Sequence, residues 1–152
     1  MLSALRRVAA FFLSVTLCFS LAACSGDANA GNKSISPEDI AVIERQAIGF
    51  KEAQDRLGDL QQLVDDQNWV FTRNLIHGPL GEVGREMSNI NVRLLKKDQA
   101  NANKLAQKLK KALEDLDEGA KDQNANRMQD AYAEVVQSFS NYAEIIPSEA
   151  LS

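Results

Sequence analysis

The chain has 152 residues, of which 45% are hydrophobic, 25% are charged and only 6% are aromatic, and its formal net charge is −4. An acidic chain with few aromatic side chains lacks both the basic surface and the stacking platforms of nucleic-acid-binding proteins, which excludes that class. The length suits a single domain.

The first 23 residues have the pattern of a signal peptide of the lipoprotein type. Arg6 and Arg7 precede an apolar or small run from Val8 to Leu21, and this order of charge and hydrophobicity is typical of export signals. The run is shorter than the roughly 20 apolar residues that cross a bilayer. The sequence Leu-Ala-Ala-Cys that ends at Cys24 resembles the bacterial lipobox, in which the cysteine is acylated and becomes the first mature residue.

Cys24 is therefore the predicted site of lipid attachment. Cys18 lies inside the apolar run and leaves with the signal, so Cys24 has no disulfide partner in the mature chain. Two or more acyl chains give stable anchoring, and the mature protein is expected to sit on a membrane without crossing it. The alternative is an ordinary signal peptide in which Cys24 is an incidental residue.

Residues 24–36 are predicted to form a flexible, lipid-anchored tether. They are small and polar and show no periodicity, and twelve such residues have a root-mean-square reach of about 20 Å. Loss of Arg6 and Arg7 with the signal changes the net charge from −4 to −6, so the mature chain is more acidic than its precursor.

The first predicted helix starts at Ser36-Pro37-Glu38-Asp39, where serine can cap, proline suits the first turn and acids complement the helix dipole. Apolar residues then recur at helical spacing over about 30 residues. They are Ile40, Ile43, Ala47, Phe50, Leu57, Leu60 and Val64.

The second predicted helix contains a helix breaker. Its apolar residues form two heptad rows, which are Trp69, Ile76, Val83 and Ile90, and Leu80, Met87 and Leu94. The period passes through Gly78-Pro79 without losing phase, which favours one helix kinked at Pro79 over two helices that reverse direction. Pro79 cannot donate a hydrogen bond to the Leu75 carbonyl, and proline inside a helix costs about 3 kcal/mol.

Two further amphipathic helices follow. The third begins after Asp98 as its predicted cap and has a basic outer face, and the fourth follows Asp122 and stops at Pro147. Their apolar stripes comprise Ala102, Leu105, Leu109, Ala112, Leu113 and Leu116, and then Ala125, Met128, Tyr132, Val135, Phe139, Tyr142 and Ile146.

These four stripes predict an all-α protein. No segment keeps a period of two, so no sheet is expected. Four amphipathic helices with short links bury their stripes most simply as an up-down-up-down four-helix bundle, over residues 37–147, with a short tail at 148–152.

The sequence offers little for catalysis or metal binding. His77 is the one histidine, so no Ser-His-Asp set, zinc pair or di-iron motif can be assembled without spending it. A haem held by His77 and a methionine is disfavoured, because His77 lies about 100° around the helix from Ile76. We predict that the protein is not an enzyme and has no metal site.

Two acidic segments have simpler interpretations. Asp122-Gln-Asn124-Ala-Asn126 imitates the start of a calcium-binding loop, but Arg127 stands where that loop needs glycine and Ala133 where it needs an acid. We interpret it as a capped helix start. Glu114, Asp115, Asp117 and Glu118 are interpreted as a solvated helix end.

Three segments carry a family resemblance. Asp66-Gln-Asn-Trp69, Ile76-His-Gly-Pro-Leu-Gly81, and Leu94-Leu95 followed by Lys97-Asp-Gln99 resemble the cyanobacterial PsbQ-like proteins, which are lipid-anchored relatives of the PsbQ subunit of the photosystem II oxygen-evolving complex. The resemblance covers the chain after the tether.

The resemblance implies a non-catalytic extrinsic subunit, lipid-anchored on the lumenal side of the thylakoid membrane. Its partners would be the photosystem II core and the other extrinsic oxygen-evolving subunits. It would stabilise that complex and support calcium and chloride retention near the manganese cluster, with no cofactor of its own. The alternative is a generic lipid-anchored exported bundle that binds a haem or a metal.

The helix breaker suggests where a partner docks. A surface shaped by a kink offers Arg73, His77, Gly78 and Pro79 as candidate docking residues. The alternative is that this element only curves the second helix around the bundle.

Overall fold

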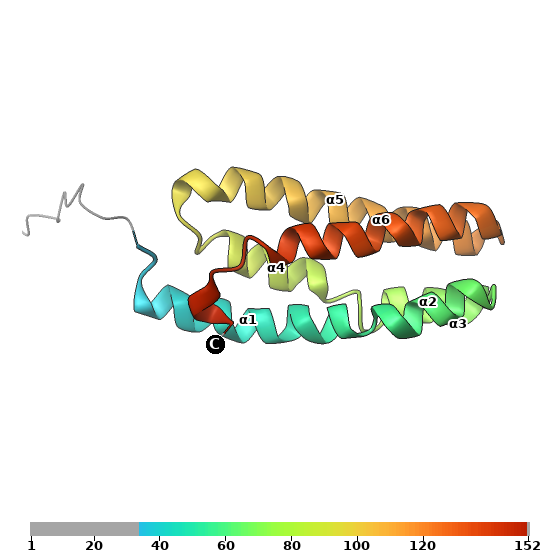
Figure 1. Ribbon diagram of the computed structural model, residues 1–152, viewed down its shortest axis with the longest axis horizontal. Coiled ribbons are helices and arrows are strands. Elements are labelled where there is room, and N and C mark those ends of the chain that lie inside the picture. The colour runs from blue at the N-terminus through green and yellow to red at the C-terminus, as the bar shows by residue number, and fades with distance from the viewer. Residues whose placement is uncertain (1–33, 152) are drawn as a thin grey trace, which may run out of the picture. The chain divides into compact units, whose positions relative to one another are not determined.

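The computed structural model describes residues 34–151; the predicted signal peptide, Cys24 and most of the predicted tether lie outside that range. The elements are α1 (Pro37–Asp55), α2 (Leu57–Asp65), α3 (Trp69–His77), α4 (Val83–Asn91), α5 (Lys96–Lys121), α6 (Ala125–Ala143) and the 3-10 helix η1 (Ser148–Ala150). They form four rods in alternating directions, α1 with α2, α3 with α4, α5, and α6 (Figure 1). The predicted all-α, up-down-up-down four-helix bundle is confirmed, and none of these residues forms a strand.

The first rod follows the predicted stripe but bends. The Ser36 hydroxyl accepts a hydrogen bond from the Asp39 N–H (3.1 Å), as expected for the cap, and α1 continues to Asp55. Arg56 then separates α1 from α2. Gly58 lies just beyond, and glycine costs about 1 kcal/mol in a helix, so the sequence is weak as a helix at this point.

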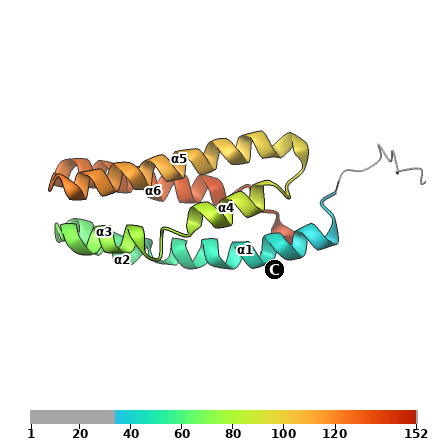
Figure 2. The ribbon, with the colours of Figure 1, turned by 180° about the vertical axis from the view of Figure 1, so that it is seen from behind.

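The second rod departs from the predicted single kinked helix. The helix ends at His77 and a new one begins at Val83, with turns between them (Figures 1 and 2). The kink expected at Pro79 is therefore a wider interruption. Its physical reason is that Pro79 lacks an N–H while the neighbouring Gly78 and Gly81 have low helix propensity.

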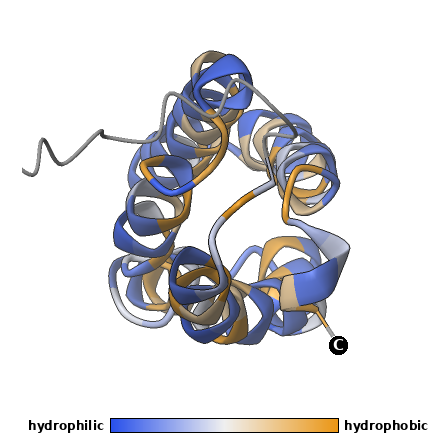
Figure 3. Cartoon of the chain, turned by 90° about the vertical axis from the view of Figure 1, so that its left-hand side faces the viewer, coloured by the Kyte–Doolittle hydropathy of each residue, from blue (hydrophilic) through white to orange (hydrophobic). Residues whose placement is uncertain are grey.

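The predicted apolar phase survives this interruption. Ile76, Leu80, Val83 and Met87 are all buried, although they come from α3, the turn and α4. Figure 3, seen along the bundle, shows hydrophobic colour on the inward faces of the helices. Burial of a continuous stripe thus sets the direction of the rod.

The two helical hairpins at one end of the bundle are closed by two turns of the same sequence and geometry. Asp66–Asn68 links α2 to α3 and Asp122–Asn124 links α5 to α6, and both read Asp-Gln-Asn. In each, the asparagine N–H donates to the carbonyl five residues back (2.8 and 2.9 Å), and its side chain accepts from the N–H three residues on (3.3 and 3.0 Å). This is a Schellman motif. The cap of the last helix is thus Asn124, within the segment that was interpreted from the sequence as a capped helix start.

The start of α5 also differs from expectation. The helix begins at Lys96 with Leu95 as its cap residue, so Asp98 lies in the first turn and is not the cap. The Gln99 amide holds the preceding turn, because it donates to the carbonyls of Val92 (3.2 Å) and Leu94 (2.8 Å).

An aromatic cluster and a partly buried polar network join the rods. The rings of Phe139 and Tyr142 lie 5.3 and 5.1 Å from that of Phe50. The Tyr142 hydroxyl lies 2.6 Å from the Asn91 amide oxygen, and the Asn91 amide donates to Asn103 (2.8 Å). Burial raises the pKa of Tyr142 well above its ordinary value. The network links α4, α5 and α6.

The backbone conformation of these two turns leads to a prediction about stability. Gln67 and Gln123 have φ values of 51° and 53°, a left-handed conformation that costs a residue with a Cβ about 1–2 kcal/mol but that glycine adopts freely. Because glycine also loses more entropy on folding, Gln67→Gly and Gln123→Gly should each raise the free energy of unfolding in urea by about 0.5–1 kcal/mol.

Gln61→Gly is the matched control, since Gln61 is exposed within α2. It should destabilise by about 1 kcal/mol. Destabilisation by both turn variants would show that the glutamine side chains contribute contacts of their own.

Candidate docking site

The interruption at residues 78–82 leaves the Leu75 carbonyl hydrogen-bonded. In a regular helix Pro79 would leave the Leu75 carbonyl without a donor, but here the Leu80 N–H donates to that carbonyl (3.1 Å). Gly78 makes the arrangement possible, because a Cβ at this position would lie 2.9 Å from the Asn74 carbonyl oxygen. The sequence Gly-Pro therefore fits this open turn.

The side chains around the interruption face two different directions. His77 and Leu80 line a hollow of about 470 Å³ against α5. Pro79 lines a separate hollow of about 720 Å³ against the bend between α1 and α2, opposite Arg56. Gly78 and Pro79 are exposed. The four predicted docking residues thus do not form one patch.

Arg73 and His77 do come together, through Asp117 of α5. One oxygen of the Asp117 carboxylate lies 3.0 Å from Arg73 Nε and 2.8 Å from His77 Nε2. The Asp117 side chain is 19% exposed and that of His77 is 62% exposed. The carboxylate therefore fixes α3 to α5, while most of the imidazole surface remains open to solvent.

The electrostatics of this cluster favour an ionised Asp117. Partial burial by itself raises the pKa of the Asp117 carboxyl, but hydrogen bonds from Arg73 and His77 and their positive charge outweigh it. The pKa of Asp117 is consequently lower than its ordinary value of 3.8.

The contacts of Asp117 correct the interpretation of residues 114–118 as a solvated helix end. A sequence signal for it exists, because Asp117 follows the buried Leu113 by four residues and so lies beside the buried stripe. Arg73 and His77 are likewise four residues apart on α3. A carboxylate flanking one stripe can therefore meet an arginine and a histidine flanking another.

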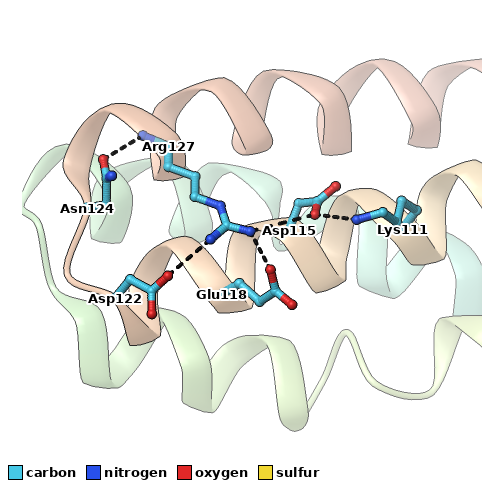
Figure 4. Close-up of polar contacts among 6 residues, drawn as sticks. All are labelled: Lys111, Asp115, Glu118, Asp122, Asn124 and Arg127. Carbon is cyan, nitrogen blue, oxygen red and sulfur yellow. Dashed lines mark hydrogen bonds and ion pairs between the residues drawn. The ribbon is translucent and has the colours of Figure 1, made fainter.

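Three other acids near the end of α5 gather around one arginine. Figure 4 shows the Arg127 guanidinium from α6 between Asp122 (3.0 Å), Glu118 and Asp115 (4.0 Å) of α5 and its cap. Asp115 also pairs with Lys111. Arg127 stands in the segment that imitates a calcium loop, and its guanidinium supplies the positive charge between these three carboxylates. Residues 34–151 contain no group of three or more His, Cys, Asp or Glu side chains arranged so that they could hold a metal ion.

This geometry defines a class of protein, a four-helix bundle whose polar clusters join its helices to one another. Residues 5–147 match the model of the PsbQ family, described as oxygen evolving enhancer protein 3. The chain belongs to that family. It is accordingly an extrinsic, non-catalytic subunit of the photosystem II oxygen-evolving complex.

A curated relative is similar over most of its length. CyanoQ of Synechocystis sp. is 37% identical over 128 residues, which cover 84% of this chain and 86% of that protein. The resemblance predicted from three short segments is confirmed.

The Asp117 cluster predicts a pH-dependent contribution to stability. Folding lowers the pKa of this carboxyl, so the ionised carboxylate contributes fully to stability when the pH is above its pKa in the unfolded state. That contribution is lost as the pH falls through its pKa in the folded state. Asp117→Asn should lower the free energy of unfolding by about 1 kcal/mol near neutral pH. Urea titrations below pH 3.8 should show this difference shrinking.

Asp59→Asn provides the control, because Asp59 pairs with Arg56 on an exposed surface, where ion pairs contribute about 0–1 kcal/mol. A difference between wild type and Asp117→Asn that stays constant down to the lowest pH would contradict the charge-based account.

Proposed function

We propose that the protein is held on the lumenal side of the thylakoid membrane by acylated Cys24. There it docks on photosystem II, stabilises the extrinsic assembly and supports calcium and chloride retention at the manganese cluster. The match of residues 5–147 to the PsbQ family carries this proposal. The similarity to CyanoQ, over most of both chains, supports it.

Membrane attachment through a lipid is consistent with the described helices. None of them is long and apolar enough to span a bilayer. The lipobox-like sequence at Cys24 supplies the alternative means of attachment, and acyl chains hold a protein on a membrane without crossing it.

We propose that docking uses the exposed parts of the interrupted rod. The exposed His77 and the half-buried Arg73 lie on the side that faces α5, and the exposed Pro79 lies on the side that faces α1 and α2, so a partner would contact the turn from both sides. Asp117, which also accepts a hydrogen bond from Arg73, holds His77 in place, so a partner would meet a side chain that is already positioned. Such positioning lowers the entropy lost on binding.

Retention of variants on purified photosystem II tests this docking. His77→Ala and Pro79→Ala should both fold, because neither removes a buried side chain, yet both should bind photosystem II more weakly than wild type. Binding is measured by co-sedimentation with photosystem II particles that lack the subunit, and folding by circular dichroism.

Gln129→Ala is the control, since Gln129 is exposed on α6, away from the interruption. Its binding should equal that of wild type. If His77→Ala and Pro79→Ala are folded and bind as tightly as the control, the Gly-Pro element only packs.

A further inference from the structure

The charges along α5 run against its helix dipole. Its first two-thirds carry six lysines and one acid, and its last third carries four acids and one lysine. Acidic residues are favourable at a helix N-terminus and basic residues at its C-terminus. The stability of the helix therefore does not account for this arrangement.

Four of these lysines make no ion pair or hydrogen bond with any residue in the described range. They are Lys96, Lys97, Lys104 and Lys108, all of them exposed, which we call the lysine face. The next two differ, because Lys110 pairs with Glu114 and Lys111 with Asp115. At 100° per residue, Lys97, Lys104 and Lys108 fall within about 40° of one another around the helix, and Lys96 lies about 100° from Lys97 in the first turn.

Nearby acids do not cancel this face. Asp98 lies in the same first turn, and Glu134 of α6 lines a groove that also contains Lys104 and Lys108. Asp115 lines this groove as well, but it is paired with Lys111. Four lysines against two carboxylates leave a positive surface on a chain whose net charge is −4. Anionic groups are the natural complement of such a surface.

The lysine face lies toward the end of the bundle where α1 begins. Figures 1 and 2 both show the first turns of α1 and α5 at the same end. Pro37, the first residue of α1, follows Cys24 by thirteen positions. The stretch from Lys96 to Lys108 spans about 18 Å of helix, similar to the reach of about 20 Å predicted for the tether.

We propose that the lysine face binds the headgroups of an anionic lipid surface, so that the bundle lies with the first half of α5 against the membrane. The inference rests on the proposed lipid anchor only for bringing this end of the bundle to the membrane. Lysines near an anionic bilayer are attracted to it, and an acyl anchor combined with a basic patch is an established two-part mode of membrane attachment. The more acidic remainder of the bundle then faces away from the lipid.

Vesicle flotation of the mature chain, residues 24–152, carrying Cys24→Ser tests the inference, because that chain has neither the predicted signal peptide nor an acylation site. It should bind vesicles of phosphatidylcholine mixed equally with phosphatidylglycerol, but not vesicles of phosphatidylcholine alone. The triple substitution Lys97→Gln, Lys104→Gln and Lys108→Gln should weaken this binding about 100-fold. High salt should weaken the binding of the unsubstituted chain as well.

A second triple substitution is matched in charge. Arg45→Gln, Lys51→Gln and Lys121→Gln also remove three exposed cations without an ion pair in the described range, and should leave vesicle binding within a few-fold of the parent. Circular dichroism verifies that both variants are folded. Equal loss in both triples, or no binding to the anionic vesicles, would overturn the inference.

Two further results separate this inference from the proposed function. If the lysine triple leaves vesicle binding unchanged but weakens binding to detergent-solubilised photosystem II, the face binds protein and the lipid inference is wrong. Mass spectrometry of the mature N-terminus shows independently whether Cys24 carries diacylglycerol. Lysine-dependent vesicle binding supports the inference even if Cys24 proves to be unmodified, a result that refutes the anchor alone.

Discussion

Burial of one apolar row across a broken helix is the constraint on which this bundle depends. Leu80 and Val83 are at most 2% exposed, although they lie in and just after the interruption. Burying each such side chain stabilises the fold by about 1.5–3 kcal/mol. Together these two offset a helix break of about 3 kcal/mol, and the rod continues in the same direction.

Once the second rod is held in this way, its neighbours can adapt to it. The bend at Arg56 lies opposite Pro79, across a shared hollow, so the first rod bends at the level where the second rod is interrupted. On the other side, Asp117 joins α3 to α5 at the residue where α3 ends. The interruption is thus supported from both flanks while its own turn remains exposed, as a surface for a partner requires.

The sequence predicted the four rods, their order and most of the buried residues, because periodicity reports which side chains are buried. It did not predict how far the helix opens at Pro79, since periodicity carries no information on backbone hydrogen bonds. Gln67 and Gln123 were missed for a related reason, because glutamine is not a residue that usually adopts the left-handed conformation. Asp117 was assigned to solvent because its partners, Arg73 and His77, are 44 and 40 positions away.

Packing, not an intact helix, holds the second rod, and native-state hydrogen exchange at the Leu80 amide is the measurement that tests this most sharply. This amide donates to the Leu75 carbonyl within the break, beneath a fully buried side chain. We expect protection similar to that of amides in the middle of α4, since they should open in the same cooperative event. Exchange near the rate of an unstructured peptide would contradict the account, because the break would then open independently of the bundle.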